Sequence, residues 1–411
     1  HSLLTGMLPR NPEAINNKAS ELLISDQPEQ AAPETFVHHL RRNGYHTVGI
    51  GKVSHHPDGL IYGAQEAVSQ KRELPYSWSE LLFDAGKWGT GNQAFFGYAD
   101  GSNRWTHEFK VKPFEAAEVA DEGYPDGLTT NLAIEKLGQL AGQDQPFFLA
   151  VGFFKPHLPF NAPQRYWDLY KRDEIELSQF PDLPENVHPA SLHNSGEINR
   201  YLAGDEQASL ETPLSDDYAR KLIHSYYASI SYTDALVGRL LAELDRLQLK
   251  GNTVVVLWSD HGWLLGDYRT WGKHVLFDQA LRSPLIIRLP ETQGGRALSE
   301  VVSTVDVYPT LMELCGVEMP YETDGASLAG LMAGGDLVDK PAFSFFRDGI
   351  SMRTERYRLT RYARPELPGI ELFDHRLDPG ETRNVSQSHA ETLDQLMPDL
   401  MSRNAGRLEF E

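Results

Sequence analysis

Short apolar runs recur along the chain, and their length and β-branched content predict β-strands. Three of these runs stop abruptly at side chains that can carry charge or bind a metal ion. They are residues 47–51, followed by Lys52 and His55; residues 147–154, followed by His157; and residues 254–258, followed by Asp260 and His261. The carboxyl ends of parallel strands meet at one edge of a sheet, and open α/β sheets keep their active sites there. We therefore expect these side chains to share one pocket.

A fourth segment adds to this set. Lys273 and His274 follow the Asp-His pair and come before another apolar run, residues 285–289. Taken singly, a Lys or His after a strand is more often a solvated loop residue, and a lone Asp-His pair is often a turn cap beside a hydrogen-bonded imidazole. The agreement of four segments favours a shared functional site over four unrelated loop residues.

Amphipathic stretches alternate with the apolar runs and predict helices. They are residues 33–44, 129–140, 216–249 and 305–316. In the first, Phe36, Val37 and Leu40 share one face, and Gly44 ends the helix. The apolar stripe of the longest one consists of Ile223, Tyr226, Tyr227, Ile230, Leu236, Leu240, Leu241 and Leu244. This alternation predicts an α/β fold, with a mostly parallel sheet covered by helices on both faces.

The pattern changes toward the C-terminus. Beyond Pro341, four short runs predict an antiparallel sheet: residues 342–346, 349–353, 357–362 and 371–374. We expect a smaller C-terminal α+β domain over residues 326–411, beside a catalytic α/β domain over residues 1–325. Residues 160–215 are rich in Pro, Asn and acidic residues and have little periodicity, so we expect them to form a long surface excursion.

The composition agrees with a large enzyme of one or two domains. Hydrophobic residues make up 40% of the 411 residues, and no apolar run approaches the roughly 18 residues that a membrane helix needs. The formal net charge of −20 argues against nucleic acid or anionic lipid as a partner, because the field of the protein would repel both. Cys315, expected as a buried thiol, is the one cysteine, so no disulfide can form within the chain and the compartment stays open.

The residue types at the strand ends suit the hydrolysis of an anionic ester. Lys52 and Lys273 can hold and neutralise an oxyanion, and the imidazoles can carry protons near neutral pH. Asp260 and His261 can bind a divalent cation. Carboxylate-rich sites favour Ca²⁺ or Mg²⁺ and imidazole-rich sites favour Zn²⁺, so these residue types alone leave the metal open.

Four motifs carry a resemblance to a known family. They are Gly51-Lys-Val-Ser-His55, Phe154-Lys-Pro-His-Leu-Pro159, Ser259-Asp-His-Gly-Trp-Leu-Leu-Gly266 and Trp271-Gly-Lys273. In this order they resemble the type I, formylglycine-dependent sulfatases, most closely the iduronate-2-sulfatase branch, and the likeness covers nearly the whole chain. The resemblance implies an alkaline-phosphatase-like, mostly parallel sheet sandwiched by helices, with a smaller C-terminal α+β domain that contains an antiparallel sheet.

The resemblance also implies roles for the strand-end residues. Asp260 and His261 would bind a Ca²⁺ ion, with Mg²⁺ or Zn²⁺ less favoured. Lys52 and Lys273 would bind the sulfate, and His157 would protonate the departing sugar oxygen. The implied substrate-binding residues are Lys52, His157, Lys273 and His274, and the implied catalytic residues are Lys52, His55, His157 and Lys273. The nucleophile of the family is the hydrate of a formylglycine made from a signature Cys or Ser.

The chain departs from the family pattern at its start. Ser2-Leu-Leu-Thr-Gly6 resembles the family segment that directly follows the signature. The formylglycine and a pair of Asp metal ligands are therefore expected in residues that precede His1, and we expect the chain as written to be inactive and to fold poorly without them. No signal peptide is recognisable, and the resemblance favours a bacterial periplasmic or extracellular enzyme.

We predict a sulfuric ester hydrolase that removes sulfate from a carbohydrate, such as a 2-O-sulfated uronic acid of a glycosaminoglycan or a similar polysaccharide. Two alternatives stay open: a metal-dependent phosphatase or phosphodiesterase of the same superfamily, which uses two Zn²⁺ ions, and a noncatalytic glycan-binding pseudoenzyme. Aromatic and polar residues near the strand ends are candidate sugar contacts, although each is more often a solvated loop or strand-face residue. They are Trp88, Asn92, Arg104, Trp105, His107, Tyr166, Trp167, His193, Asn194, Arg347, Arg353 and Arg361.

Overall fold

The computed structural model describes residues 1–9, 15, 33–290, 292, 294–335, 340–404, 406 and 408–409. A parallel sheet has the strand order β2 (Glu80–Leu82), β1 (His46–Gly51) and β4 (Phe147–Gly152). β1 pairs in parallel with both neighbours, and its last residue stands opposite the last residue of β4. The two predicted strands that lead to Lys52 and His157 are therefore confirmed as parallel neighbours.

The strand before the Asp-His pair is paired differently. This strand, β6 (Val255–Trp258), runs antiparallel to β9 (Leu285–Arg288), because the segment between them folds back past the strand end. All four residues of β6 are half-buried. The predicted mostly parallel arrangement is thus seen in β1, β2 and β4, and the β6–β9 pair is an antiparallel exception.

Helices form at the four predicted amphipathic stretches: α3 (Phe36–Arg42), α5 (Pro125–Leu140), α7 (Asp216–Arg246) and α9 (Val307–Cys315). The other described α-helices are α1 (Ser2–Thr5), α4 (Gly91–Phe95), α6 (Gln164–Trp167), α8 (Asp278–Leu281), α10 (Ala329–Met332) and α11 (Ala390–Ser402). The side chain of Thr35 caps α3. Phe36, Val37 and Leu40 are buried, in agreement with the sequence. Gly316, with φ 65°, ends α9 as predicted.

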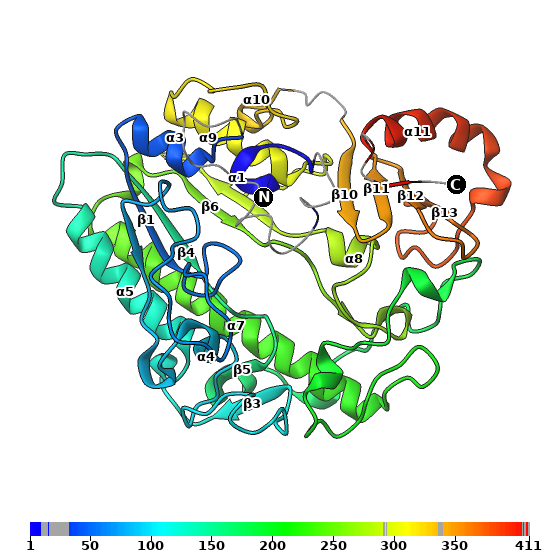
Figure 1. Cartoon of the computed structure of the whole chain (residues 1–411), viewed down its shortest axis with the longest axis horizontal. Helices are drawn as coiled ribbons and strands as arrows, with labels where there is room; N and C mark the ends of the chain where they lie inside the picture. The colour runs from blue at the N-terminus through cyan, green and yellow to red at the C-terminus, as the bar shows by residue number, and fades with distance from the viewer. Residues whose placement is uncertain are drawn as a thin grey trace.

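β4 has a helical layer on each side. Successive strand residues point to opposite faces. Phe148 and Ala150 pack in a core with α3 and α9, whereas Leu149 and Val151 pack in a second core with α5 and α7. Figure 1 shows the same arrangement, with α3 and α9 above the strands and α5 and α7 below them. The predicted α/β sandwich is confirmed.

The long helix α7 turns most of its predicted apolar stripe inward. Ser215 caps its start, and Ile223, Leu236 and Leu244 are buried. Tyr227 and Ile230 are 37% and 43% exposed, so the prediction is wrong for these two. At this level the buried face consists of Leu222, Ser225, Ala228, Ser229 and Tyr232. Three residues of this face, Ser225, Ala228 and Ser229, are small, so the helix can lie close to its neighbours there. The larger side chains of Tyr227 and Ile230 point outward.

The segment 160–215 is more than a surface excursion. Its first strand, β5 (Phe160–Pro163), pairs in parallel with β3 (Phe114–Ala117). Tyr166 and Trp167, which follow on α6, are buried in a core shared with α7. These two rings pack against α7, and their contact with a sugar stays a prediction.

The predicted antiparallel sheet is present. Its order is β10 (Ala342–Phe346), β11 (Gly349–Arg353), β12 (Tyr357–Tyr362) and β13 (Ile370–Asp374). α11 packs on it through a core that includes Leu359 and Leu400. Figure 1 shows this unit at the right of the molecule, beside the C-terminus. A two-stranded antiparallel pair, β7 (Leu264–Leu265) with β8 (Trp271–Gly272), lies just before Lys273.

A buried ion-pair network connects the C-terminal sheet to the segment that follows Lys273. Arg358 on β12 is fully buried and pairs with Glu381, with Nη2 and Oε2 2.9 Å apart. Its Nη1 donates to the carbonyl oxygen of Leu276. His375 contacts the same carboxylate at 2.7 Å. The sheet and the segment before α8 are thus held together by charged hydrogen bonds as well as by packing.

Two expectations from composition can be compared with the described part of the chain. None of its helices has both the length and the apolar character that a membrane crossing requires. Cys315, at the end of α9, is half-buried, so it is more exposed than the buried thiol that the sequence predicts.

Candidate active site

Glu197 lies at the centre of a cluster of charged side chains and imidazoles. Its Oε1 atom is 3.0 Å from Nε2 of His157 and 3.3 Å from Nζ of Lys273. Its Oε2 atom is 3.9 Å from Nδ1 of His274. The side chains of Glu197 and Lys273 are 19% and 15% exposed, so solvent screens this cluster poorly. The structure thus gathers three predicted residues around a carboxylate that the sequence analysis does not single out.

The orientation of His157 is fixed from several sides. Its Nδ1 atom is 2.7 Å from the carbonyl oxygen of Leu158, and its ring lies 4.5 Å from that of Phe95. Burial and the charge of Lys273 lower the pKa of His157, whereas Glu197 raises it. Burial alone would raise the pKa of Glu197, but the hydrogen bond with His157 and the charge of Lys273 lower it. Glu197 is therefore an ionised carboxylate in contact with an imidazole and an ammonium group.

Asp260 and His261 follow β6 directly, as predicted. Nε2 of His261 is 3.5 Å from Oδ2 of Asp260, and Nδ1 of His261 is 2.7 Å from the carbonyl oxygen of Gly262. Because Nδ1–H donates to this carbonyl, Nε2 keeps a lone pair that a metal ion can use. Partial burial opposes ionisation of Asp260, but the neighbouring side chains of His261 and Lys52 lower its pKa. An ionised carboxylate beside a free imidazole nitrogen fits a divalent cation.

Lys52 enters the cluster from the end of β1. Its backbone N–H donates to the carbonyl oxygen of Gly152 at 2.9 Å, where the backbones of β1 and β4 approach closely. A Cβ atom on Gly152 would lie 1.9 Å from the carbonyl oxygen of Lys52, and Gly51 has φ +74°. Burial lowers the pKa of the Lys52 ammonium, while Asp260 raises it. Two glycines therefore allow the strands to end side by side and bring Lys52 within electrostatic range of Asp260.

The cluster extends toward the C-terminal sheet. The ring of His274 stacks on Phe346 at 5.6 Å and lies 6.0 Å from the ring of His193. Nδ1 of His193 accepts the N–H of Ser195, so Nε2 carries the hydrogen, and this buried group has no hydrogen-bond partner among the described residues. Burial, with His274 and Arg347, lowers the pKa of His193 to about 4. Two candidate sugar contacts, His193 and Arg347, thus lie beside the cluster.

Other predicted residues lie in different surroundings. His55 is exposed in the turn after Lys52, with its ring 5.5 Å from that of His56. Trp88 is buried, and its Nε1–H donates to the carbonyl oxygen of Tyr98, so its prediction as a sugar contact is wrong. Its ring fills a core instead. The predictions for Asn92, Arg104, Trp105, His107, Asn194, Arg353 and Arg361 stay predictions.

The described residues contain one group of three potential metal ligands close to one another, and it does not include Asp260 or His261. The group is Asp278, His375 and Glu381. The Arg358 guanidinium already pairs with its central carboxylate, so we interpret the group as part of the ion-pair network. The roles of Asp260 and His261 as metal ligands stay a prediction.

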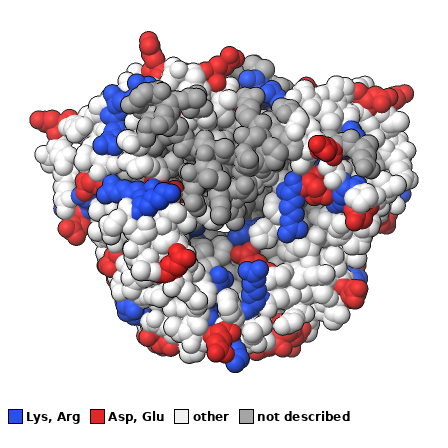
Figure 2. All heavy atoms as spheres, viewed as in Figure 1, with Lys and Arg blue, Asp and Glu red and all other residues white. Residues whose placement is uncertain are grey.

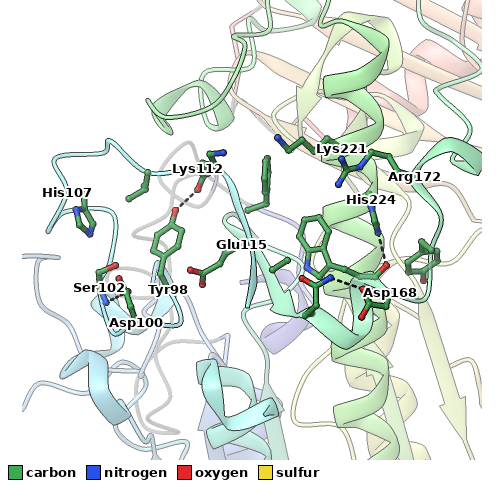
Figure 3. Close-up of a pocket in the computed structure, with 16 residues that line it drawn as sticks. Tyr98, Asp100, Ser102, His107, Lys112, Glu115, Asp168, Arg172, Lys221 and His224 are labelled. Atoms are coloured by element: carbon green, nitrogen blue, oxygen red, sulfur yellow. Dashed lines mark hydrogen bonds between the residues drawn. The ribbon is translucent and has the colours of Figure 1, made fainter. Parts of the chain in front are cut away.

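Figure 2 shows acidic and basic side chains scattered over one face of the molecule. Figure 3 shows a hollow between residues 98–116 and the helices α6 and α7, whose volume is about 550 Å³. Its Tyr98 hydroxyl donates to the carbonyl oxygen of Lys112, and none of the strand-end residues lines it. We therefore place the candidate active site at the cluster, where mutually perturbed charges converge.

Sequence reasoning missed Glu197 for a local reason. The residue lies between two single 3₁₀ turns, Pro189–Ser191 and Ile198–Arg200, where neither the period of a strand nor that of a helix leads to it. The signal that identifies it is spatial: a carboxylate enclosed by cations from two other segments.

Comparison with known proteins gives an independent result. The family model described as Sulfatase matches residues 1–317. The chain belongs to the sulfatase family. A second model, described as N-sulphoglucosamine sulphohydrolase, C-terminal, matches residues 266–405. Membership assigns the chain to the sulfuric ester hydrolases, whose relatives extend into the alkaline phosphatase superfamily and which generally use a metal ion and a formylglycine.

Individual relatives agree with this assignment. A sulfatase of Formosa agariphila is 28% identical over 408 residues, which cover 97% of this chain and 76% of that protein. The iduronate 2-sulfatase of Homo sapiens is 32% identical over 315 residues, which cover 70% of this chain and 55% of that protein. The chain thus spans about half the length of the second relative. A solved phosphonate monoester hydrolase of Agrobacterium radiobacter, 22% identical, shares the fold, with a TM-score of 0.73 over 99% of this chain and 85% of that one.

Proposed function

We propose that this sulfatase removes sulfate from a carbohydrate, in particular from a 2-O-sulfated uronic acid of a glycosaminoglycan or a similar polysaccharide. The observation that carries the proposal is the convergence of two lysines, His157 and the Asp260–His261 pair at the strand ends. Similarity to the iduronate 2-sulfatases of Homo sapiens and Mus musculus supports the choice of sugar. His193 and Arg347, beside the cluster, offer a hydrogen-bond donor and a positive charge that suit a uronate carboxylate.

The proposed roles follow from the geometry of the cluster. Lys52 and Lys273 bind the sulfate oxygens and neutralise charge that develops on them in the transition state. His157 donates a proton to the sugar oxygen as the bond between sulfur and oxygen breaks. His274 binds the substrate beside Lys273, and His55 lies in the turn that follows Lys52, where it would contact the nucleophile.

We propose Ca²⁺ as the metal ion, held in part by Asp260 and His261. When bound, the ion supplies positive charge that polarises the sulfate group. We further propose that residues preceding His1 contribute the formylglycine. The charge of Glu73 raises the pKa of both the α-amino group of His1 and the ammonium of Lys52, although burial lowers both, and this shared neighbour supports a position of the chain start near Lys52.

Two wider proposals accompany this function. Residues 1–325 would form the catalytic domain and residues 326–411 a smaller domain, since β10–β13 and α11 share a core of their own. We propose that the enzyme acts in the bacterial periplasm or outside the cell, where polysaccharides are accessible.

The test is a substrate panel, assayed with the full-length protein. We expect turnover of a 2-O-sulfated uronate disaccharide to exceed that of 6-O-sulfated glucosamine and of a phosphate monoester, to be lost after chelation, and to return with Ca²⁺. Faster turnover of the phosphate ester with Zn²⁺ would favour the phosphatase alternative. Glycan binding without any turnover would favour the pseudoenzyme.

A further inference from the structure

The two ring nitrogens of His157 both face oxygen atoms at hydrogen-bond distance. Nδ1 is 2.7 Å from the carbonyl oxygen of Leu158, which can only accept. Nε2 is 3.0 Å from Oε1 of Glu197. A neutral imidazole carries one ring hydrogen, so one of these contacts would then join two acceptors. A doubly protonated ring satisfies both contacts.

The second proton belongs on the imidazole rather than on the carboxylate. Nζ of Lys273 is 3.3 Å from the same Oε1 atom, and His274 approaches Oε2 at 3.9 Å. These positive groups favour the ionised form of Glu197. Burial and the charge of Lys273 lower the pKa of His157 and so oppose a second proton, and only the contact with Glu197 favours it. While this contact is made, we infer that the free site holds an imidazolium, a carboxylate and an ammonium group together. Asp260 adds a further negative charge in the vicinity of His157.

Oε1 of Glu197 occupies a position in which an oxygen atom of the substrate would contact the same side chains. It contacts His157 and Lys273, the two groups that the proposed function directs at the sulfate ester. An ester oxygen would need the same two donors, so Glu197 and the substrate compete for them. Oε2 of Glu197 is buried without a hydrogen-bond partner among the described residues, so this carboxylate is incompletely held where it is.

We propose that Glu197 is a positioning residue that acts as an internal counter-ion: it holds the second proton on His157 in the free enzyme, and the ester oxygen of the substrate displaces it. This inference rests on the proposed function. After displacement, an oxygen nucleophile bonds to sulfur, the bond between sulfur and the sugar oxygen breaks, and the Nε2 proton passes to the leaving oxygen, which keeps the electron pair of the broken bond. The neutral ring then regains a proton from water as Glu197 returns.

Replacement by glutamine separates the charge of Glu197 from its shape. In Glu197→Gln, the side-chain amide can donate to Nε2 of a neutral His157, so the variant stabilises the ring without its second proton. It also removes the competing negative charge. At neutral pH this variant would have to take up a proton on His157 when an anion binds, so the two proteins are compared at about pH 5, where protonation of an imidazole costs less. There we expect inorganic sulfate, titrated calorimetrically into the full-length protein, to bind Glu197→Gln about tenfold more tightly or better than wild type.

Two variants accompany this titration. Glu197→Asp keeps the negative charge, so it should not reproduce the gain in sulfate affinity expected of Glu197→Gln. Glu211→Gln removes an exposed carboxylate from the same part of the chain and should leave sulfate affinity unchanged. Equal or weaker binding of sulfate by Glu197→Gln, in a variant whose thermal unfolding matches wild type, would overturn the proposal.

The pH dependence of turnover gives a second readout. The profile of kcat/KM reports the free enzyme, and the profile of kcat reports the substrate complex. We expect the alkaline limb of kcat/KM to move to lower pH in Glu197→Gln, because the carboxylate no longer supports the imidazolium. The limb of kcat should stay in place, because the substrate has already displaced Glu197 in wild type.

The outcomes separate this inference from the proposed function. Equal shifts of both limbs would show that Glu197 stays with His157 in the complex and would refute displacement. Unshifted limbs would refute its role as counter-ion. Absence of sulfate-ester turnover in wild type would refute the proposed function, while the sulfate titration, which needs no turnover, would still report on competition by Glu197.

Discussion

Lys273 extends across an aromatic ring before it reaches the cluster. Its Nζ atom is 5.4 Å from the centre of the Trp263 ring and 3.3 Å from Glu197. Its alkyl stem is enclosed, so the ammonium group is fixed in place. A fixed cation stabilises charge that develops on a sulfate oxygen without first having to reorganise.

Removing this cation should have a large effect on rate. In Lys273→Ala, we expect kcat/KM for the sulfate ester to fall by about a hundredfold or more, since positioned electrostatic groups contribute on this scale. Steady-state kinetics on the full-length protein would measure it. Lys250→Ala removes a lysine that is 60% exposed and should leave the kinetics unchanged. Near-wild-type turnover in Lys273→Ala would contradict the assigned role.

At the scale of elements, the approach of β1 and β4 positions one edge of the site. The last residues of the two strands stand opposite each other, and Gly152 leaves no space for a side chain toward the Lys52 carbonyl. A methyl group there requires the strand ends to separate. The sulfate-binding role of Lys52 thus depends on the backbone of the neighbouring strand.

Gly152→Ala should weaken both the fold and the site. We expect the free energy of unfolding to fall by about 1–3 kcal/mol, the usual cost of overpacking, and kcat/KM to fall because Lys52 is displaced. Denaturant unfolding and kinetics would measure the two effects. Gly138→Ala lies in the exposed interior of α5 with no atom within 4 Å of the added Cβ, so it should stabilise by about 1 kcal/mol. Unchanged stability in Gly152→Ala would show that the strand ends adjust freely.

Local patterns predicted those elements whose own residues decide their structure. The strand that ends at Lys52 and the helix α3 are of this kind. The spacing of their apolar residues, and the residues that cap the helix, can be recognised from neighbouring positions in the sequence. The direction of β9 depends on how the preceding segment folds back, and the burial of Trp167 depends on α7. Glu197 depends on cations from two distant segments. Contacts of this range leave no period in the sequence.

At the scale of the whole molecule, Arg358 and Glu381 place a charged pair in the interior. Burial alone would raise the pKa of Glu381, but Arg358 and His375 lower it to about 2. The carboxylate is therefore more readily ionised in the folded protein than in the unfolded chain. A lowered folded pKa contributes stability above the unfolded value, and this contribution is lost as pH falls toward the folded value.

Lowering the pH should therefore destabilise the protein over a defined pH range. We expect the free energy of unfolding to decrease between about pH 4.5, the ordinary value of a glutamate, and about pH 2. Glu381→Gln should be less stable at neutral pH by about 3–5 kcal/mol, since it leaves Arg358 unpaired, and should depend less on pH in this window. Denaturant unfolding as a function of pH would measure both. Glu355→Gln removes a carboxylate that is 70% exposed and should keep the wild-type profile.

The hydrogen bond from Arg358 to the carbonyl of Leu276 also bears on how such a protein can be inherited. The donor belongs to the C-terminal sheet, and the acceptor follows Lys273 and His274 by two or three residues. A recombination event that exchanged the C-terminal sheet for one without a cation at this position would leave a buried carbonyl unpaired beside the site. The C-terminal sheet and the segment that contains Leu276 are thus expected to be inherited together. A chimera should fold only if its C-terminal sheet has a cationic side chain at the position of Arg358.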